Sequence, residues 1–319
     1  MHLDEYEVSR KISYKIFKHN GTTWNLSDYP YLDIVLNDNC NAKCKFCISH
    51  LIHDKCKADI EVFKPKIEYA ISKLGVREVL LLGGEATINN DLIPMITFLK
   101  DLRLKKICLT TNGHRLATDA VYRERLIGSG ITHLNLSVMS ADPIVQMHIS
   151  RSKIALGHQD FLAIHREAKI NGVHVRINNN VFVGNHDTLD ALIQFYVHVN
   201  TYCDSVKFSP LLKTDAFSTI NEVTEFNRIH TLSDVQYDTL WTSVERYYHD
   251  WPLLRNPKTL GFVEYSMILL PVPIIFNYNQ HGKLMQMVVN EKKVHGFKLL
   301  PTGDLSLSWN REMPQYFIA

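Results

Sequence analysis

The sequence of 319 residues predicts an α/β protein built on a parallel sheet. Six short β-rich segments alternate with segments of helical periodicity between residues 31 and 210. Such alternation favours parallel strands joined by helical crossovers. Periodicity alone leaves open whether the sheet is doubly wound and open or curves into a barrel.

The elements follow one another without a long gap. Strands are expected at residues 31–37, 78–82, 105–110, 132–138, 173–181 and 205–209. Helices are expected at residues 61–74, 92–102, 117–127, 158–170 and 188–199. Pro65 is tolerated only in the first turn of a helix, so the first helix is expected to start close to it and to end at Gly75.

The segments on either side of this repeat differ from it. Residues 1–30 are expected to form a small β extension, because residues 8–17 partly alternate and Asn20-Gly21 is a hairpin-turn signal. Residues 31–215 form the expected α/β domain. Residues 216–319 begin polar and helical and become strand-rich, which predicts an α+β cap.

Composition narrows the class of protein. With 35 basic and 33 acidic residues, the net charge is +2, which argues against a nucleic-acid or membrane surface. The N-terminus carries acids and no apolar run, which argues against a signal peptide. The most apolar stretch, residues 267–276, contains two prolines and is too short to span a bilayer. The chain is therefore expected in the cytoplasm.

Three of the six cysteines, Cys40, Cys44 and Cys47, form a CxxxCxxC motif. Disulfides are disfavoured in the cytoplasm, so clustered cysteines indicate metal or redox chemistry. Thiolates suit iron–sulfur clusters or zinc. Three cysteines can hold three irons of a cubane and leave the fourth iron open to a nitrogen and oxygen ligand.

A structural zinc site is the alternative, with its fourth ligand from His50, His53 or Cys56. Structural zinc sites usually combine two spaced pairs of ligands. No second pair of cysteines follows here, so the spacing favours the cluster over zinc.

The motif resembles the signature of the radical S-adenosylmethionine (SAM) superfamily, CxxxCxφC, with Phe46 as its aromatic residue. Gly83-Gly84-Glu85, 36 residues after Cys47, resembles the GGE motif of that family. Further resemblances follow in order along the chain: Thr111-Asn112-Gly113, Ser137, Arg151, and the segment from Asn178 to Gly184.

The resemblance covers about residues 31–215 and looks closest to enzymes of molybdenum-cofactor biosynthesis and peptide maturation. Ala86 departs from it, since many relatives have proline after GGE. The family implies a partial (β/α)₆ barrel with its site at the carboxyl ends of the strands.

The resemblance also implies the cofactors. One [4Fe–4S] cluster is expected on the three cysteines, reduced by a protein such as flavodoxin or ferredoxin. SAM is expected to contact Phe46, Gly83, Gly84, Glu85, Asn112, Ser137, Arg151 and Asn178. Glu85 is expected to offer an anion to the SAM ammonium group. The family's chemistry splits SAM into methionine and a 5′-deoxyadenosyl radical, which takes a hydrogen atom from the substrate.

Strand parity predicts which side chains face the interior, because alternate residues of a barrel strand do so. The polar faces include Thr110, Asn135, Arg176 and Lys207. A filled barrel core would be aliphatic, so this lumen is interpreted as a binding cavity whose cations hold the substrate. The alternative is that Arg176 and Lys207 pair with lumenal acids such as Asp33.

Cys108 shares the lumenal face, and two roles are open for it. It could donate a hydrogen atom to a substrate radical, although a small buried packing residue is the commoner outcome. Cys203 is expected to be structural.

Residues 294–309 resemble the hairpin that opens an auxiliary-cluster extension in relatives. No cysteine follows Cys203, so one cluster is expected, and the hairpin is expected to cap the barrel and contact the substrate.

Two functions compete within the family. The first is an enzyme acting on a small anionic molecule, such as a nucleotide, sugar acid or amino-acid derivative. The second is a maturase of a peptide or protein. The cationic lumen favours the small molecule, as do the 30 N-terminal residues, which are too few for a winged-helix leader-binding domain. A non-catalytic zinc-binding module is a remote third possibility.

Overall fold

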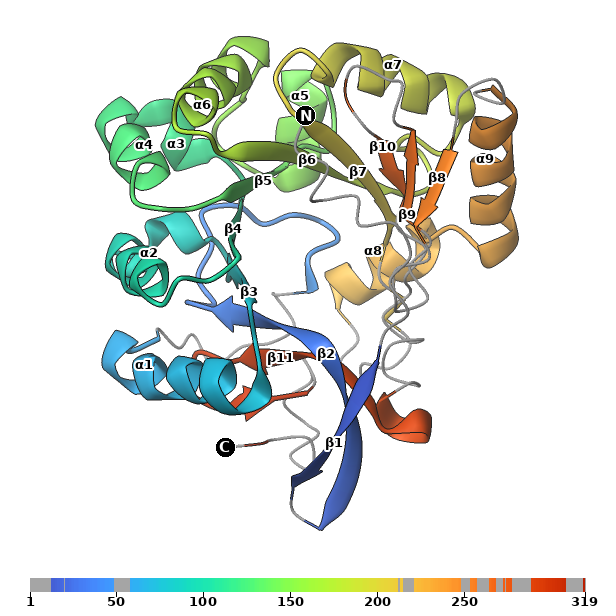
Figure 1. Ribbon diagram of the computed structural model, residues 1–319. Helices are drawn as coiled ribbons and strands as arrows, with labels where there is room; N and C mark the ends of the chain where they lie inside the picture. The colour runs from blue at the N-terminus through green and yellow to red at the C-terminus, as the bar shows by residue number, and fades with distance from the viewer. Residues whose placement is uncertain are drawn as a thin grey trace.

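The computed structural model describes residues 13–19, 21–48, 58–211, 213–214, 221–247, 253–256, 264–267, 272, 274–276, 288–307 and 318. Its centre is one curved sheet with the order β12-β11-β2-β3-β4-β5-β6-β7-β10-β9-β8, to which β1 adds by pairing with β2 (Figure 1). The strands from β11 to β10 in this order are all parallel. The prediction of a partial α/β barrel is confirmed.

The six expected strands form the middle of the sheet. They are β2 (Thr22–Val35), β3 (Glu78–Leu82), β4 (Lys106–Thr111), β5 (His133–Ser137), β6 (His174–Val181) and β7 (Ser205–Pro210). The helices between them are α1 (Ile60–Tyr69) with a π-helical end (Ala70–Leu74), α2 (Leu92–Asp101), α3 (His114–Thr118), α4 (Ala120–Ile127), α5 (Pro143–Ser150), α6 (His158–Ile170) and α7 (Leu189–Val199).

The start of the first helix lies further from Pro65 than expected. α1 begins at Ile60, five residues before Pro65, because Asp59 caps it by accepting a 2.9 Å hydrogen bond from the Glu61 N–H. The N–H that Pro65 lacks would have paired with the carbonyl of Glu61, an exposed residue where water can replace it. The expected bounds, 61–74, agree with α1 and its π-helical end within one residue, but Pro65 lies in the second turn rather than the first.

Helix α5 was not predicted, although the sequence carries a signal for it. Asp142 accepts hydrogen bonds from the N–H groups of Ile144 and Val145, and Pro143 occupies the first turn. Asp followed by Pro is a common helix start. The helix is only two turns long, which hid its periodicity.

The segments outside the repeat join the same sheet. β1 (Tyr14–His19) forms the expected hairpin with β2, and β2 continues without a break into the barrel, so residue 30 lies inside a strand. β11 (Lys293–Leu299) and β12 (Leu305–Ser306) extend one edge. β10 (Ile274–Phe276), β9 (Glu264–Met267) and β8 (Leu253–Asn256) extend the other, near α8 (Glu222–His230) and α9 (Asp234–Tyr247). The division into three domains stays a prediction.

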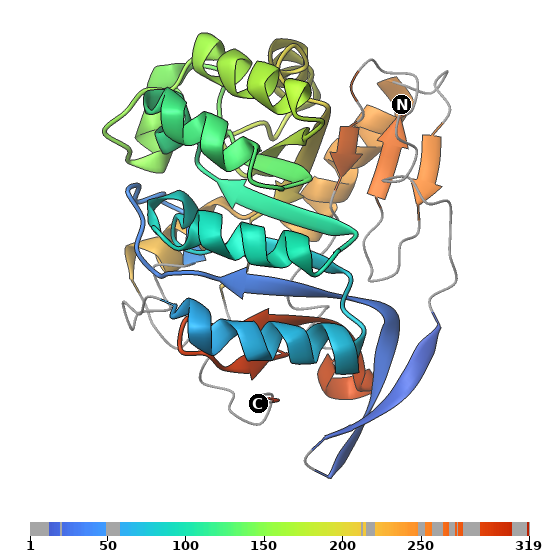
Figure 2. The ribbon, with the colours of Figure 1, turned by 60° about the vertical axis from the view of Figure 1, so that its left-hand side comes forward.

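The core lies between the sheet and the helices on its outer face, where α1, α2, α4 and α6 follow one another along the sheet (Figure 2). Leu81, Leu109, Leu136, Ile177 and Phe208 point to this side and have no exposed surface. Burying such a side chain contributes about 1.5–3 kcal/mol. In the part of the chain that the structure describes, no helix is long and apolar enough to cross a membrane.

Candidate functional site

The three cysteines lie in the loop that follows β2, and neighbouring elements fix its backbone. The N–H groups of Lys43 and Lys45 donate to the carbonyls of Ser150 and Ile149, at 3.0 and 3.1 Å. Both carbonyls belong to the last turn of α5. The Asn227 amide of α8 donates to the Phe46 carbonyl at 3.2 Å. The loop is thus held from two sides.

The three thiols are half-buried. Cys40 Sγ accepts a hydrogen bond from the Ala42 N–H at 3.3 Å, and Asn112 Nδ2 lies 4.0 Å from it. Burial raises the pKa of Cys40 to about 12, and it also raises the pKa of Cys44. Bound metal deprotonates a thiol outright, so iron would release these protons. Three soft donors on one fastened loop fit an iron–sulfur cluster.

The fourth zinc ligands that the sequence offers, His50, His53 and Cys56, lie outside the described residues. Among residues that the structure does describe, no three His, Cys, Asp or Glu side chains gather around a point that could hold one metal ion.

Phe46 packs into a small apolar cluster behind the loop. Its ring centroid lies 6.1 Å from that of Phe182, and the cluster also contains Met139, Ile149 and Leu211. Phe46 therefore anchors the cysteine loop to the ends of the barrel strands.

Gly83 and Gly84 lie against the backbone that leads into Cys40. A Cβ on Gly84 would lie 2.3 Å from the Asn39 carbonyl oxygen, and one on Gly83 would lie 2.6 Å from the Asn37 carbonyl oxygen. The N–H groups of Gly84 and Glu85 donate to these same carbonyls, of Asn37 and Asn39, at 2.7 and 2.8 Å. The glycines thus allow β3 to end directly beside the cysteine loop, a constraint that the sequence alone did not reveal.

Glu85 is 3% exposed, and both of its carboxylate oxygens are used within the protein. Oε1 accepts from the Thr87 N–H at 3.0 Å and from the hydroxyls of Thr87 and Thr111, each at 2.6 Å. Oε2 accepts from the Asn112 N–H at 2.8 Å. The carboxylate ties the end of β3 to the end of β4. That Glu85 also offers an anion to the SAM ammonium group stays a prediction.

Asn112 connects the end of β4 to the cysteine loop. Its Oδ1 accepts from the His114 N–H at 3.1 Å, and its Nδ2 donates to Asn41 Oδ1 at 2.7 Å while facing Cys40 Sγ. A continuous chain of hydrogen bonds thus runs from Glu85 through Asn112 to the edge of the cluster site.

Arg151 follows the last residue of α5 in a left-handed conformation, with φ at 46°. Its guanidinium forms a 2.8 Å ion pair with Glu222 of α8, and both side chains are largely exposed. Arg151 therefore lies beside the cysteine loop but is directed toward α8.

The remaining predicted residues line the concave side of the sheet in rows. Ser137, Asn178 and Lys207 occupy neighbouring positions on β5, β6 and β7. One row further from the strand ends, Asn135 lies beside Arg176. Arg176 Nε donates to Asn178 Oδ1 at 3.1 Å. The structure thus brings these side chains together on one half-buried polar surface.

Cys108 lies in the next row, beside His133 and His174. It is 4% exposed and four residues from Asn112, about 13 Å along the strand. This placement favours the packing role over hydrogen donation.

Asp33 lies in the same row and forms a 2.6 Å ion pair with Lys298 of β11. Each side chain is less than 10% exposed. Burial raises the pKa of Asp33, and the Lys298 charge opposes this shift. Sequence reasoning named Asp33 as a partner for Arg176 or Lys207 and missed Lys298, because nothing local indicates that β11 joins β2.

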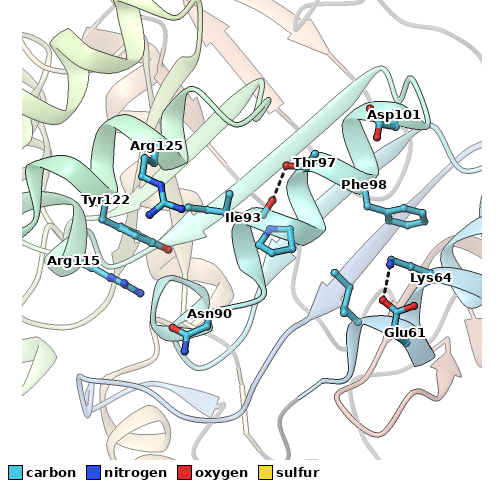
Figure 3. A pocket seen from close by; sticks show the side chains of 12 residues that line it. Glu61, Lys64, Asn90, Ile93, Thr97, Phe98, Asp101, Arg115, Tyr122 and Arg125 are labelled. Atoms are coloured by element: carbon cyan, nitrogen blue, oxygen red, sulfur yellow. Dashed lines mark hydrogen bonds and ion pairs between the residues drawn. The ribbon is translucent and has the colours of Figure 1, made fainter.

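A surface cavity of about 730 Å³ lies elsewhere, on the outer side of the barrel between α1, α2 and α4 (Figure 3). Arg115 and Tyr122 line it, with the guanidinium carbon 3.6 Å from the ring centroid. Both side chains donate to the Thr87 carbonyl, at 2.6 and 3.1 Å. None of the predicted site residues lines this cavity.

Comparisons with known proteins agree with this geometry. The family described as the radical SAM superfamily matches residues 34–199, more than half of the chain. A GTP 3′,8-cyclase of Mannheimia succiniciproducens is 26% identical over 238 residues, covering 73% of this chain and 65% of the relative. One from Pasteurella multocida is 31% identical over 119 residues, covering 36% of this chain and 34% of the relative. The chain thus spans less than two thirds of these relatives' length.

Two solved structures share the fold. Streptococcus suis SuiB bound to S-adenosylmethionine has a TM-score of 0.61 at 15% identity, covering 89% of this chain and 61% of SuiB. The native anSMEcpe with bound AdoMet has a TM-score of 0.57 at 13% identity, covering 88% of this chain and 74% of that one.

Proposed function

Because the chain belongs to the radical SAM superfamily, we propose that it removes a hydrogen atom from a small anionic substrate bound on the concave side of its barrel. When bound, the [4Fe–4S] cluster and SAM supply a carbon radical strong enough to take that atom. The protein's own part is to hold these groups, orient the substrate and exclude water. The family places the chain among enzymes, so a non-catalytic zinc module is not retained.

Cys40, Cys44 and Cys47 would hold the cluster, and we propose a single one, since the sequence has no cysteine after Cys203. The fastened loop, with its two backbone bonds to α5, fixes the three sulfur atoms relative to the strand ends. SAM would lie against the ends of β3, β4, β5 and β6, where the backbone of Gly83 and Gly84 and the side chains of Ser137 and Asn178 are placed. Glu85 would influence SAM binding indirectly, because its carboxylate positions Asn112 and the backbone at the end of β4.

The single observation that carries the substrate class is the placement of Arg176. Its guanidinium is half-buried on the concave surface, one row from Ser137 and Asn178, and it donates a hydrogen bond to the neutral amide of Asn178. Asp33 is already paired with Lys298. A partly buried guanidinium beside a cofactor site suits a phosphate or carboxylate, which it can bind through two parallel hydrogen bonds.

The relatives point in the same direction. The curated proteins named above act on GTP by their names, so a nucleotide or another phosphate-bearing molecule is the substrate class we propose. The alternative is a peptide or protein substrate. The fold shared with SuiB favours neither substrate class, because 15% identity supports the fold alone.

The radical SAM part of the proposal is tested by cofactor content. Anaerobically reconstituted protein should hold about four irons and four sulfides per chain and release 5′-deoxyadenosine slowly with dithionite. Alanine at Cys40, Cys44 or Cys47 should abolish both the iron content and the release of 5′-deoxyadenosine. Cys203→Ala, at a buried cysteine just before β7, should leave both unchanged. Stoichiometric zinc without iron would refute this part.

The substrate part is tested with GTP and inorganic triphosphate as probes, by calorimetry on the cluster-loaded enzyme. Arg176→Ala should weaken binding by about 1.5–3 kcal/mol, and Arg176→Lys by less. Arg125→Ala, on the outer cavity, serves as the matched control. Substrate-free SAM cleavage should not change. If Arg176→Ala weakens SAM binding instead, Arg176 holds the SAM carboxylate. If the variant changes neither probe binding nor SAM binding, a peptide or protein substrate is favoured.

A further inference from the structure

In the proposed function the cluster receives its electron from another protein, and one described surface combines closeness to the cysteines with the chemistry of an interface. We propose that the solvent side of α5, with the lysines at its C-terminal end, docks an acidic one-electron carrier. This inference rests on the proposed radical SAM function. One electron would leave the carrier and reduce the cluster, and no bond would form or break.

Helix α5 is in direct contact with the cysteine loop. The carbonyls of Ile149 and Ser150 end α5 and accept the N–H groups of Lys45 and Lys43, which flank Cys44. A carrier seated on α5 would therefore be separated from the cluster by one helix turn and one loop. From Ile144 to Ile149 the helix rises about 7.5 Å. Because electron transfer weakens steeply with distance, this closeness favours α5 as a docking surface.

Helix α5 and the loop after it also expose apolar side chains. Ile144 is 63% exposed and Val145 is 43% exposed, and Ile154 beyond the helix is 36% exposed. His148 follows Ile144 by one turn and is also exposed. Residues at this spacing share one side of a helix. Single exposed apolar residues are common, but neighbouring ones with a charged border match the anatomy of an interface.

Basic side chains gather at the C-terminal end of α5. Lys43 and Lys153 are exposed at the C-terminal end of α5, and Lys45 Nζ lies 2.7 Å from His148 Nε2. Cations are favoured at that end of a helix. Two acids near α5 in the described part of the chain are engaged within the protein: Asp142 caps α5, and Glu222 pairs with Arg151. The α5 surface, defined as Lys43, Lys45, Ile144, Val145, His148 and Lys153, therefore complements an acidic partner.

The size and charge of this surface suit a transient partner. Redox encounters bury less area than stable complexes, and opposite charges speed their association while making it sensitive to salt. A small apolar centre suits the small buried area, and a cationic border suits the fast, salt-sensitive association.

The test compares two matched double variants of the cluster-loaded enzyme. Ile144→Asp with Lys153→Glu reverses the α5 surface. Ile170→Asp with Lys169→Glu makes the same changes on α6, where Ile170 is 81% exposed at the helix end that leads into the start of β6. The probe is an acidic flavodoxin: its dissociation constant is measured by calorimetry at two salt concentrations, and cluster reduction by its hydroquinone is followed by anaerobic stopped flow.

We expect the α5 variant to bind flavodoxin about tenfold more weakly or worse, with a smaller salt dependence, and to be reduced more slowly by it. Dithionite is a small reductant that needs no docking, so dithionite-driven release of 5′-deoxyadenosine should match the parent. Equal flavodoxin binding in the parent and the α5 variant would overturn the proposal. So would an equal loss of flavodoxin affinity in the α5 and α6 variants, or a change only in self-association of the enzyme. Failure of dithionite-driven cleavage in the parent would instead refute the proposed function.

Discussion

The Asn112 backbone N–H donates a 2.8 Å hydrogen bond to Oε2 of Glu85, and this bond joins the end of β4 to the end of β3. The other carboxylate oxygen accepts three further hydrogen bonds from Thr87 and Thr111. Asn112 in turn faces Cys40 through its amide nitrogen. Glu85 therefore connects the ends of β3 and β4 next to the cysteine loop.

This relationship gives a first prediction. Glu85→Ala would leave buried donors on Thr87, Thr111 and Asn112 unpaired, which should lower the free energy of unfolding by about 3 kcal/mol. The Asn112 side chain would shift, so cluster content and SAM affinity should fall together. Denaturant unfolding, iron analysis and SAM calorimetry measure the three effects. If SAM affinity alone fell, at full stability and iron content, Glu85 would contact SAM directly.

A second prediction concerns the approach of β3 to the cysteine loop. Gly84→Ala would place a methyl group 2.3 Å from the Asn39 carbonyl oxygen, and backbone must move to relieve the clash. Because Asn39 precedes Cys40, iron content after reconstitution should drop and the melting temperature should fall. Gly157→Ala is the matched control, since its added Cβ would meet Pro143 at an ordinary 3.5 Å. Equal behaviour of the two variants would mean that the close approach has no role.

A third prediction concerns the buried ion pair between Asp33 and Lys298. Breaking a buried pair from one side leaves an uncompensated charge, so Lys298→Met and Asp33→Leu should each cost about 3–5 kcal/mol. The double variant should recover most of that loss, because it removes both charges. Denaturant unfolding of all four proteins gives the coupling energy. Additive losses would show that the two side chains do not stabilise the junction of β11 and β2 as a pair.

The fourth prediction is a pH dependence of stability from two histidines. Burial lowers the pKa of His186 to about 4 and that of His295 to about 4, from an ordinary value of 6.5. Between these values the unfolded chain binds more protons than the folded one, so stability rises with pH across this window and falls as pH drops from 6.5 to 4.

His186 has a positive φ of 55°, which asparagine tolerates, and His295 contacts the Tyr14 ring. The variant His186→Asn with His295→Phe should therefore show a shallower loss of stability over this pH range in denaturant titrations. An unchanged slope would mean that neither histidine is kept neutral by the fold.

The sequence alone determined the order of strands and helices in the barrel and the cysteine motif. Strand and helix periods are local, so the six central strands appear within two residues of their predicted ends, apart from the start of β2. The motif residues fall at the carboxyl ends of those strands because a parallel sheet places all such ends at one edge.

Only the tertiary structure decided which groups those residues meet. Glu85 turns toward Thr111 and Asn112 because β3 and β4 end side by side, and Gly84 must be glycine because the cysteine loop returns against it. Lys298 reaches Asp33 across 265 positions of sequence, since β11 comes back to pair with β2. Such contacts depend on how the sheet curves and which strands flank it, and no local pattern of residues encodes that.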